Sequence, residues 1–164
     1  MDRWQQIDNS QPEVAKEILR RANGSSRWID LMMARRPFGS ADALQSLARS
    51  EWFSLDEDDW LEAFAHHPKI GDRASLEKRF PATHDLSAKE QAGVGSARTD
   101  VIDALSEANE TYLERFGFIF IVCATGKSAE EMLKMLRDRL SNDRATELRI
   151  AAEEQAKITA LRLR

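Results

Sequence analysis

Apolar residues recur every three or four positions along most of the chain, which is the spacing of an amphipathic helix. The pattern predicts helices over residues 12–23, 26–37 and 40–53, the first stopped by Gly24 and the second by Pro37. The N-terminal third is therefore predicted to be a series of short helices. One apolar stripe of the first helix is formed by Val14, Ala15, Ile18 and Leu19.

Three Ser-x-x-Glu pairs have the spacing of a capping box, in which the serine begins a helix. They predict a helix that runs into two adjacent histidines, a long helix over about 88–116 that ends at Gly117, and a helix over 129–140. A last helix starts at Asn142 or Asp143. The pairs are Ser54 with Glu57, Ser87 with Glu90, and Ser128 with Glu131.

The segment FIFIVCA, residues 118–124, is the one stretch whose sequence is also compatible with a β-strand. No second convincing strand is available to pair with it, so we interpret it as buried chain that leads into the next helix. Pro and Gly are scarce, at 4 and 7 residues, and there is no internal repeat. The predicted fold is all-α: a single compact helical domain over residues 1–164 with about seven or eight helices.

The composition limits the classes of protein to consider. With 42% hydrophobic residues the 164-residue chain can bury a core, and its net charge of −4 argues against a general nucleic-acid binder. The longest apolar run is far below the roughly 18 residues of a membrane span, and no leader peptide is expected. The single cysteine, Cys123, excludes an intrachain disulfide. We therefore expect a cytoplasmic protein.

Two of the three histidines, His66 and His67, are adjacent in the stretch AHHPKIGD. Neighbouring residues on a helix point about 100° apart, so the two side chains have different surroundings. Pro68 disfavours helical geometry at His67, and Gly71 permits a turn. One interpretation is a surface histidine beside a hydrogen-bonded one. The other is that His67, at the rim of a loop, is a general acid/base, because its ordinary pKa lies near 6.5.

A metal site is the alternative chemistry. The adjacent histidines and the later THD (83–85) resemble the scattered ligand pattern of the helical metal-dependent phosphohydrolases called HD domains, with Asp100 or Asp103 as the last ligand. A His-Asp pair is common by chance, so the signal is weak. A non-catalytic helical scaffold is the third hypothesis.

Ser87, Glu90 and Gln91 admit two interpretations. The first two fit a capping box, which stabilises a helix by about 1 kcal/mol. Together with Gln91 they also place a hydroxyl, a carboxylate and an amide around one helix N-terminus, a favourable position for a polar or anionic ligand. Both interpretations stay open from the residues alone.

Five segments together resemble one enzyme family. In chain order they are RPF (36–38), HPKIGD (67–72), SAKEQAG (87–93), FGFIFIVCATGKS (116–128) and LSNDRATEL (140–148). They are similar to the 2-oxo-4-hydroxy-4-carboxy-5-ureidoimidazoline (OHCU) decarboxylases. The resemblance implies an all-α enzyme without cofactor or metal that converts OHCU to (S)-allantoin, the third step of urate oxidation. It implies a small-molecule substrate, with no nucleic acid and no membrane as partner, and leaves open whether the protein is a homodimer.

The resemblance also implies which residues act. His67 would be catalytic and His66 incidental, with Glu90 orienting and charge-balancing His67. The roles of His84 and Lys127 stay open. The substrate pocket would be lined by Pro68, Ser87, Gln91, Phe116, Gly117, Phe118, Ile119, Phe120 and Ile121.

Overall fold

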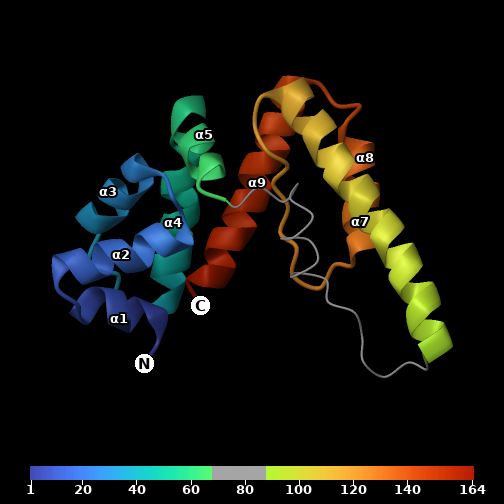
Figure 1. The fold of residues 1–164 in the computed structure, drawn as a ribbon. Helices are drawn as coiled ribbons and strands as arrows, with labels where there is room; N and C mark the ends of the chain where they lie inside the picture. The colour runs from blue at the N-terminus through green and yellow to red at the C-terminus, as the bar shows by residue number, and fades with distance from the viewer. Residues whose placement is uncertain (68–87) are drawn as a thin grey trace. The chain divides into compact units, whose positions relative to one another are not determined.

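The computed structural model describes residues 1–67 and 88–164, with backbone alone for 88–98. Within these ranges it contains eight α-helices and no β-strand, which confirms the predicted all-α class (Figure 1). No helix among the described residues is both long and apolar enough to cross a membrane. The helices are α1 (Arg3–Asn9), α2 (Pro12–Ala22), α3 (Ser26–Ala34), α4 (Ala41–Phe53), α5 (Glu57–Ala65), α7 (Ala88–Phe116), α8 (Ala129–Arg139) and α9 (Arg144–Arg162).

The chain divides into two units. Unit 1 comprises Met1–His67 and Leu148–Arg164, and unit 2 comprises Pro68–Glu147. Helices α1 to α5 belong to unit 1, whereas α9 begins in unit 2 and continues into unit 1. The single domain predicted over residues 1–164 stays a prediction.

Unit 1 is built around buried tryptophans. The indole N–H of Trp28 donates to the carbonyl of Ala48 at 3.0 Å, and that of Trp52 donates to the carbonyl of Ala152 at 2.9 Å. Both rings are buried, so these bonds satisfy polar groups that would otherwise be costly to bury. The second bond ties α4 to α9, although the two residues are 100 positions apart.

Unit 2 contains α7 and α8. The chain between them includes residues 118–124, for which a β-strand was the alternative interpretation. That segment is neither helix nor strand, and five of its seven residues are buried, which confirms the interpretation as buried chain. Phe116, Phe118 and Phe120 surround the buried ring of Tyr112 at centroid distances of 4.6 to 5.9 Å. Cys123, the single cysteine of the chain, is buried within this segment.

Several predicted helix ends are confirmed by their hydrogen bonds. Ser128 Oγ accepts from the backbone N–H of Glu131 at 3.2 Å and begins α8. Asp143 Oδ1 accepts from Thr146 at 2.7 Å and begins α9. Gly117 follows α7 with a φ of 80°, a conformation that favours glycine.

The predicted cap at Ser54 is wrong. The backbone N–H of Ser54 still bonds to the carbonyl of Ser50 at 3.2 Å, so Ser54 closes α4. Asp56 caps α5 instead, because its carboxylate accepts from the backbone N–H of Asp59 at 3.3 Å. Two residues with side chains that can cap a helix, Ser54 and Asp56, lie within three positions of each other. The later one begins the helix.

Three further differences concern the N-terminal helices. The first helix, α1, was not predicted, although Asp2 and Gln5 form a capping box and Ile7 is fully buried. Helix α3 ends at Ala34, before the predicted stop at Pro37. Val14 is 52% exposed, because the buried face of α2 is formed by Ala15, Leu19 and Ala22.

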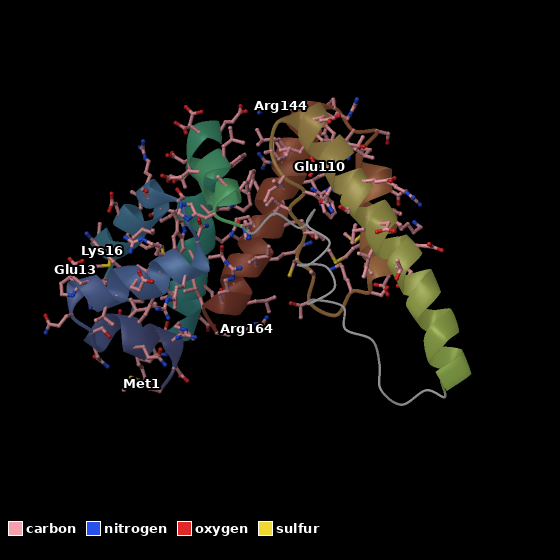
Figure 2. All side chains as sticks on the ribbon, viewed as in Figure 1. Met1, Glu13, Lys16, Glu110, Arg144 and Arg164 are labelled. Atoms are coloured by element: carbon pink, nitrogen blue, oxygen red, sulfur yellow. The ribbon has the colours of Figure 1, made fainter. Side chains whose placement is uncertain are left out.

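Charged side chains lie on the outer faces of both units. Glu13 on α2 and Glu110 on α7 are examples of exposed carboxylates (Figure 2). This agrees with a chain in which 32% of residues are charged and 42% are hydrophobic.

Candidate active site

His67 lies directly after the last turn of α5. The helix ends at Ala65, His66 is its C-cap, and the backbone N–H of His67 bonds to the carbonyl of Phe64 at 3.1 Å. The helix therefore stops at the two histidines, as the sequence predicted. This backbone bond holds His67 at a fixed position beyond the helix.

The imidazole of His67 is half-buried and hydrogen-bonded to α9. Its Nε2 contacts the side-chain carbonyl oxygen of Gln155, a residue with 0% exposure. Burial lowers the pKa of His67, and the charge of Arg162 acts in the same direction, while the bond to Gln155 opposes them. The neutral imidazole is therefore favoured near pH 7, and this is the form that accepts a proton.

His66 has different surroundings, as adjacent positions at a helix end require. It is exposed, and its ring lies against Gly24, where an added Cβ would stand 2.5 Å from the His66 Cγ. Only a glycine fits at position 24 with His66 in this place. This arrangement supports a packing role for His66 and leaves His67 as the candidate acid/base.

Gln155 and Arg162 are functional candidates that the sequence interpretation missed. Together with Thr159 they occupy positions i, i+4 and i+7 of α9, which is one face of the helix. Polar residues that interrupt an otherwise apolar face were the available signal. Their partner His67 is 88 positions from Gln155, so no local pattern indicated the contact.

Of the predicted site residues, two lie outside the described residues and two are described by their backbone alone. Pro68 and Ser87 fall in the gap between residues 67 and 88. Glu90 and Gln91 lie in the first turn of α7, where the backbone alone is described. The long helix that they were predicted to begin is present from Ala88, and their placement beside His67 stays a prediction.

The predicted apolar wall, Phe116 to Ile121, belongs to unit 2. Phe116, Phe118, Phe120 and Ile121 are buried, whereas Gly117 is exposed and Ile119 is partly exposed. The three phenylalanine rings are packed around Tyr112. Of this segment's larger side chains, Ile119 is thus the least covered.

A buried ion pair anchors this segment. Arg139 pairs with the fully buried Glu147 and also donates to the carbonyl of Ile121 at 2.8 Å. Tyr112 donates its hydroxyl to Glu147 at 2.5 Å, and Asn142 donates to the same carboxylate at 3.1 Å. The pKa of Tyr112 is raised by burial and by this bond, so the phenol stays a donor. These contacts explain the LSNDRATEL motif as a structural clamp.

Lys127 has a local partner. Its Nζ donates to the carbonyl of Cys123 at 2.7 Å, across the turn that precedes α8. His84, the other residue whose role the sequence left open, lies outside the described residues.

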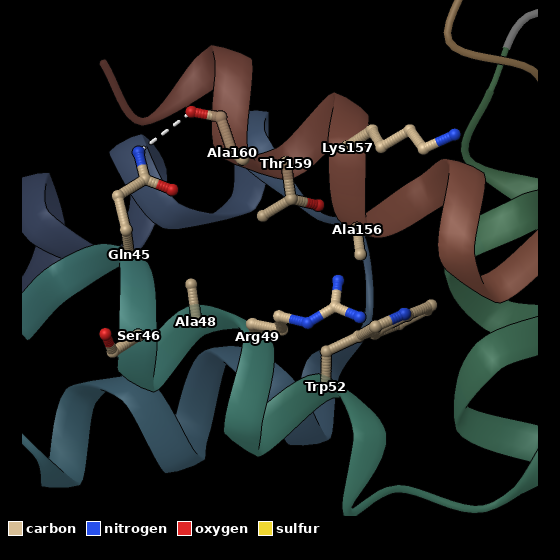
Figure 3. A pocket seen from close by; sticks show the side chains of 9 residues that line it. All are labelled: Gln45, Ser46, Ala48, Arg49, Trp52, Ala156, Lys157, Thr159 and Ala160. Carbon is tan, nitrogen blue, oxygen red and sulfur yellow. Dashed lines mark hydrogen bonds between the residues drawn. The ribbon is translucent and has the colours of Figure 1, made fainter. Parts of the chain in front are cut away.

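A cavity of about 360 Å³ lies between α4 and α9 in unit 1 (Figure 3). Its two cations are paired, Arg49 with Glu153 at 3.0 Å and Lys157 with Glu154 at 2.5 Å. None of the predicted site residues whose side chains are described lines it, whereas Thr159, which is bonded to Gln155, does. Its walls are formed by Gln45, Ser46, Ala48, Arg49, Trp52, Ala156, Lys157, Thr159 and Ala160.

The metal alternative finds no support among the described residues. In residues 1–67 and 88–164 no group of three or more His, Cys, Asp or Glu side chains is arranged to hold a metal ion. Asp100 and Asp103, the candidate last ligands, lie on α7, and the THD stretch falls in the gap.

The fold and the site together define a class. This is an all-helical protein with a half-buried histidine at a helix end, held by a neutral amide and biased toward its basic form. Such a group suits an enzyme that moves a proton on a small substrate.

Comparison with known proteins gives the family. The family model for OHCU decarboxylase matches residues 8–164, and the chain belongs to that family. It is 36% identical over 152 residues to the uric acid degradation bifunctional protein of Arabidopsis thaliana, covering 92% of this chain and 47% of that protein. It is 30% identical over 141 residues to the 2-oxo-4-hydroxy-4-carboxy-5-ureidoimidazoline decarboxylase of Halalkalicoccus jeotgali, covering 84% and 76%.

A solved structure is similar over almost the whole chain. A crystal structure of OHCU decarboxylase in the presence of (S)-allantoin superimposes with a TM-score of 0.73 at 36% identity, covering 94% of this chain and 96% of that one. The chain spans about half the length of the Arabidopsis relative, which is bifunctional.

Proposed function

We propose that this chain catalyses the cofactor-independent decarboxylation of OHCU to (S)-allantoin in urate degradation. The match to the OHCU decarboxylase family over residues 8–164 carries the proposal. The half-buried, hydrogen-bonded His67 supports it, because the reaction requires a proton shuttle.

The substrate contains its own electron sink. OHCU carries a carboxylate and a hydroxyl on one ring carbon, beside a C=N bond. When the bond to the carboxylate breaks, its electron pair forms a C=C bond to the neighbouring carbon, and the C=N nitrogen takes up a proton. The resulting enol loses its hydroxyl proton, and the neighbouring carbon gains one. The net change is loss of carbon dioxide and uptake of one proton.

His67 would move the proton between the hydroxyl and the neighbouring carbon. Glu90 would orient His67 and balance its charge, while Ser87 and Gln91 would fix the ring and the ureido group. Pro68 and the segment 116–121 would shape the walls that exclude water. Allantoin forms in one hand when the proton arrives from one face.

A cytoplasmic location and a homodimer belong to the same proposal. The cysteine count supports the location, because the single Cys123 cannot form an intrachain disulfide that needs an oxidising compartment. Sedimentation equilibrium tests the dimer: a mass of one chain across a broad concentration range contradicts it.

The experiment is an assay with freshly generated OHCU, followed by its loss of ultraviolet absorbance, before and after exhaustive treatment with a chelator. We expect consumption well above the uncatalysed rate and equal rates in the two samples. No acceleration overturns the proposal and leaves a helical scaffold. OHCU consumption that is lost on chelation and restored by zinc or manganese overturns the cofactor-independent mechanism, whereas metal-dependent hydrolysis of a phosphate ester without OHCU consumption favours the metal-dependent phosphohydrolase alternative.

A further inference from the structure

A chain of buried polar side chains leads away from His67 into unit 1. His67 contacts Gln155, and Gln155 Nε2 donates to the hydroxyl of Thr159 at 3.1 Å. The same hydroxyl accepts from Asn23 Nδ2 at 3.3 Å, and Asn23 Oδ1 accepts from the backbone N–H of Ser25 at 3.0 Å. The four residues beyond His67 are at most 3% exposed, so no water competes for these bonds.

The direction of every bond in this chain follows from its far end. A backbone N–H can only donate, so Asn23 must present its oxygen to Ser25 and its nitrogen to Thr159. Thr159 has one hydroxyl proton, which goes to a backbone carbonyl, that of Gln155 at 2.9 Å or that of Ala22 at 3.4 Å. It therefore accepts from the nitrogen of the Gln155 amide, and the amide oxygen faces His67.

An amide oxygen accepts hydrogen bonds and cannot donate them, so the His67 nitrogen that faces it must carry a proton. We propose that Gln155 is a positioning residue that holds His67 in the tautomer with hydrogen on Nε2, so that Nδ1 is the nitrogen that exchanges a proton with the substrate. The second half of this statement rests on the proposed function.

Proton exchange at Nδ1 suits this arrangement in both halves of a catalytic cycle. The neutral ring and the protonated ring each keep a hydrogen on Nε2, so the bond to Gln155 persists while Nδ1 gains and loses its proton. Exchange at Nε2 would require the bond to break, or the Gln155 amide to turn over against Thr159, in every turnover. The bond from Thr159 to the backbone carbonyl of Gln155 or of Ala22 opposes that rotation, because a turned-over amide would need the same hydroxyl proton.

The tautomer is tested directly on the wild-type protein. With ¹⁵N-labelled histidine there are three imidazoles to assign, and His67→Asn identifies the signal of interest. Two-bond ¹⁵N–¹H correlation spectra above the titration range of His67 distinguish the two neutral forms. We expect hydrogen on Nε2. Hydrogen on Nδ1 overturns the inference, whatever the turnover of the protein.

Two substitutions at Gln155 separate positioning from packing. Gln155→Leu keeps the approximate volume and removes the acceptor, so we expect a mixture of tautomers and a kcat about 10- to 100-fold lower, with little change in KM. Gln155→Glu keeps an acceptor toward Nε2, and the Thr159 hydroxyl can turn to donate to it. It should retain the Nε2–H form and recover kcat at higher pH. A carboxylate raises the pKa of His67, against the lowering by the charges of Arg162 on α9 and of His66 at the C-cap of α5.

Gln45→Leu is the matched control. Gln45 also donates to α9, to the carbonyl of Ala160 at 2.9 Å, and it lies outside the chain of bonds to His67. It should leave the tautomer and kcat unchanged. Equal pH–rate profiles for Gln155→Leu and Gln155→Glu, or the same kcat loss in Gln45→Leu, contradict the positioning role. If the wild-type protein does not consume OHCU, the proposed function is wrong, and proton transfer at Nδ1 is wrong with it. The spectra still determine the tautomer of His67 in that case.

Discussion

At the scale of single residues, the two adjacent histidines have separate surroundings because the end of α5 turns them apart. His66 packs on Gly24, where no side chain larger than hydrogen fits, and His67 reaches the buried amide of Gln155. A half-buried imidazole with a lowered pKa, such as that of His67, is a base near neutral pH. We therefore propose that the chemistry depends on His67 and not on His66.

Substitution of each histidine tests this division. His67→Asn should lower turnover of OHCU by about 100-fold or more, the scale of general acid/base catalysis. Its thermal midpoint should stay within a few degrees of the wild type, because the residue is only half-buried. His66→Asn is the paired control and should retain most of the activity. An equal loss of turnover in the two variants would show that the wrong histidine was chosen.

The lowered pKa of His67 also has a consequence for stability. The unfolded chain binds a proton at about pH 6.5, whereas the folded protein binds it only at lower pH. The free energy of unfolding should therefore fall as the pH is lowered through about 6.5. Urea unfolding of the wild type and of His67→Asn at pH 7.5 and 5.5 measures the effect. The wild type should lose more stability than the variant, and equal losses would remove His67 as the cause.

At the scale of elements, the segment 118–124 keeps its shape through polar contacts instead of strand pairing. Arg139 on α8 joins Glu147 on α9 and the carbonyl of Ile121, and Tyr112 on α7 donates to the same carboxylate. Three helices thus hold one irregular stretch of chain. A buried charge without its partner is costly, so the clamp depends on both ions being present.

Removal of one ion tests the clamp. Arg139→Met leaves the carboxylate of Glu147 buried and unpaired, so we expect a loss of roughly 3–5 kcal/mol in the free energy of unfolding. The double variant Arg139→Met, Glu147→Leu should be more stable than the single one, because it removes the unpaired charge as well. Chemical denaturation of the three proteins gives the comparison. A double variant that is less stable than Arg139→Met would exclude the ion pair as the source of the loss.

Helix ends were predictable where their signal is local. Ser128, Asp143 and Gly117 act within one turn of their own position, and the sequence indicated all three. Ser54 was misplaced because Asp56, two residues later, offers a competing cap. Val14 was misplaced because the apolar stripe of α2 is wider than the face that it buries. Each difference reflects a choice that only tertiary packing decides.

At the scale of the whole molecule, the class of fold and the family were predictable, and the environment of the site was not. The all-α class follows from helical periodicity, and the family from five motifs in order. The contact between His67 and Gln155 joins positions 88 apart, and neither residue's neighbours indicate the other. Hydrogen bonds of this range depend on how helices pack, so the periodicity of one helix carries no information on them.

The optical activity of the product tests whether His67 delivers the proton to one face of the substrate. Allantoin formed from freshly generated OHCU is followed by circular dichroism with the wild-type protein, with His67→Asn and without protein. We expect (S)-allantoin alone from the wild type. From His67→Asn we expect a slow reaction whose product approaches the racemate of the uncatalysed one, because His67 would deliver the proton to one face. Racemic allantoin formed at the full wild-type rate, or optically pure allantoin formed at that rate by His67→Asn, would contradict this role of His67.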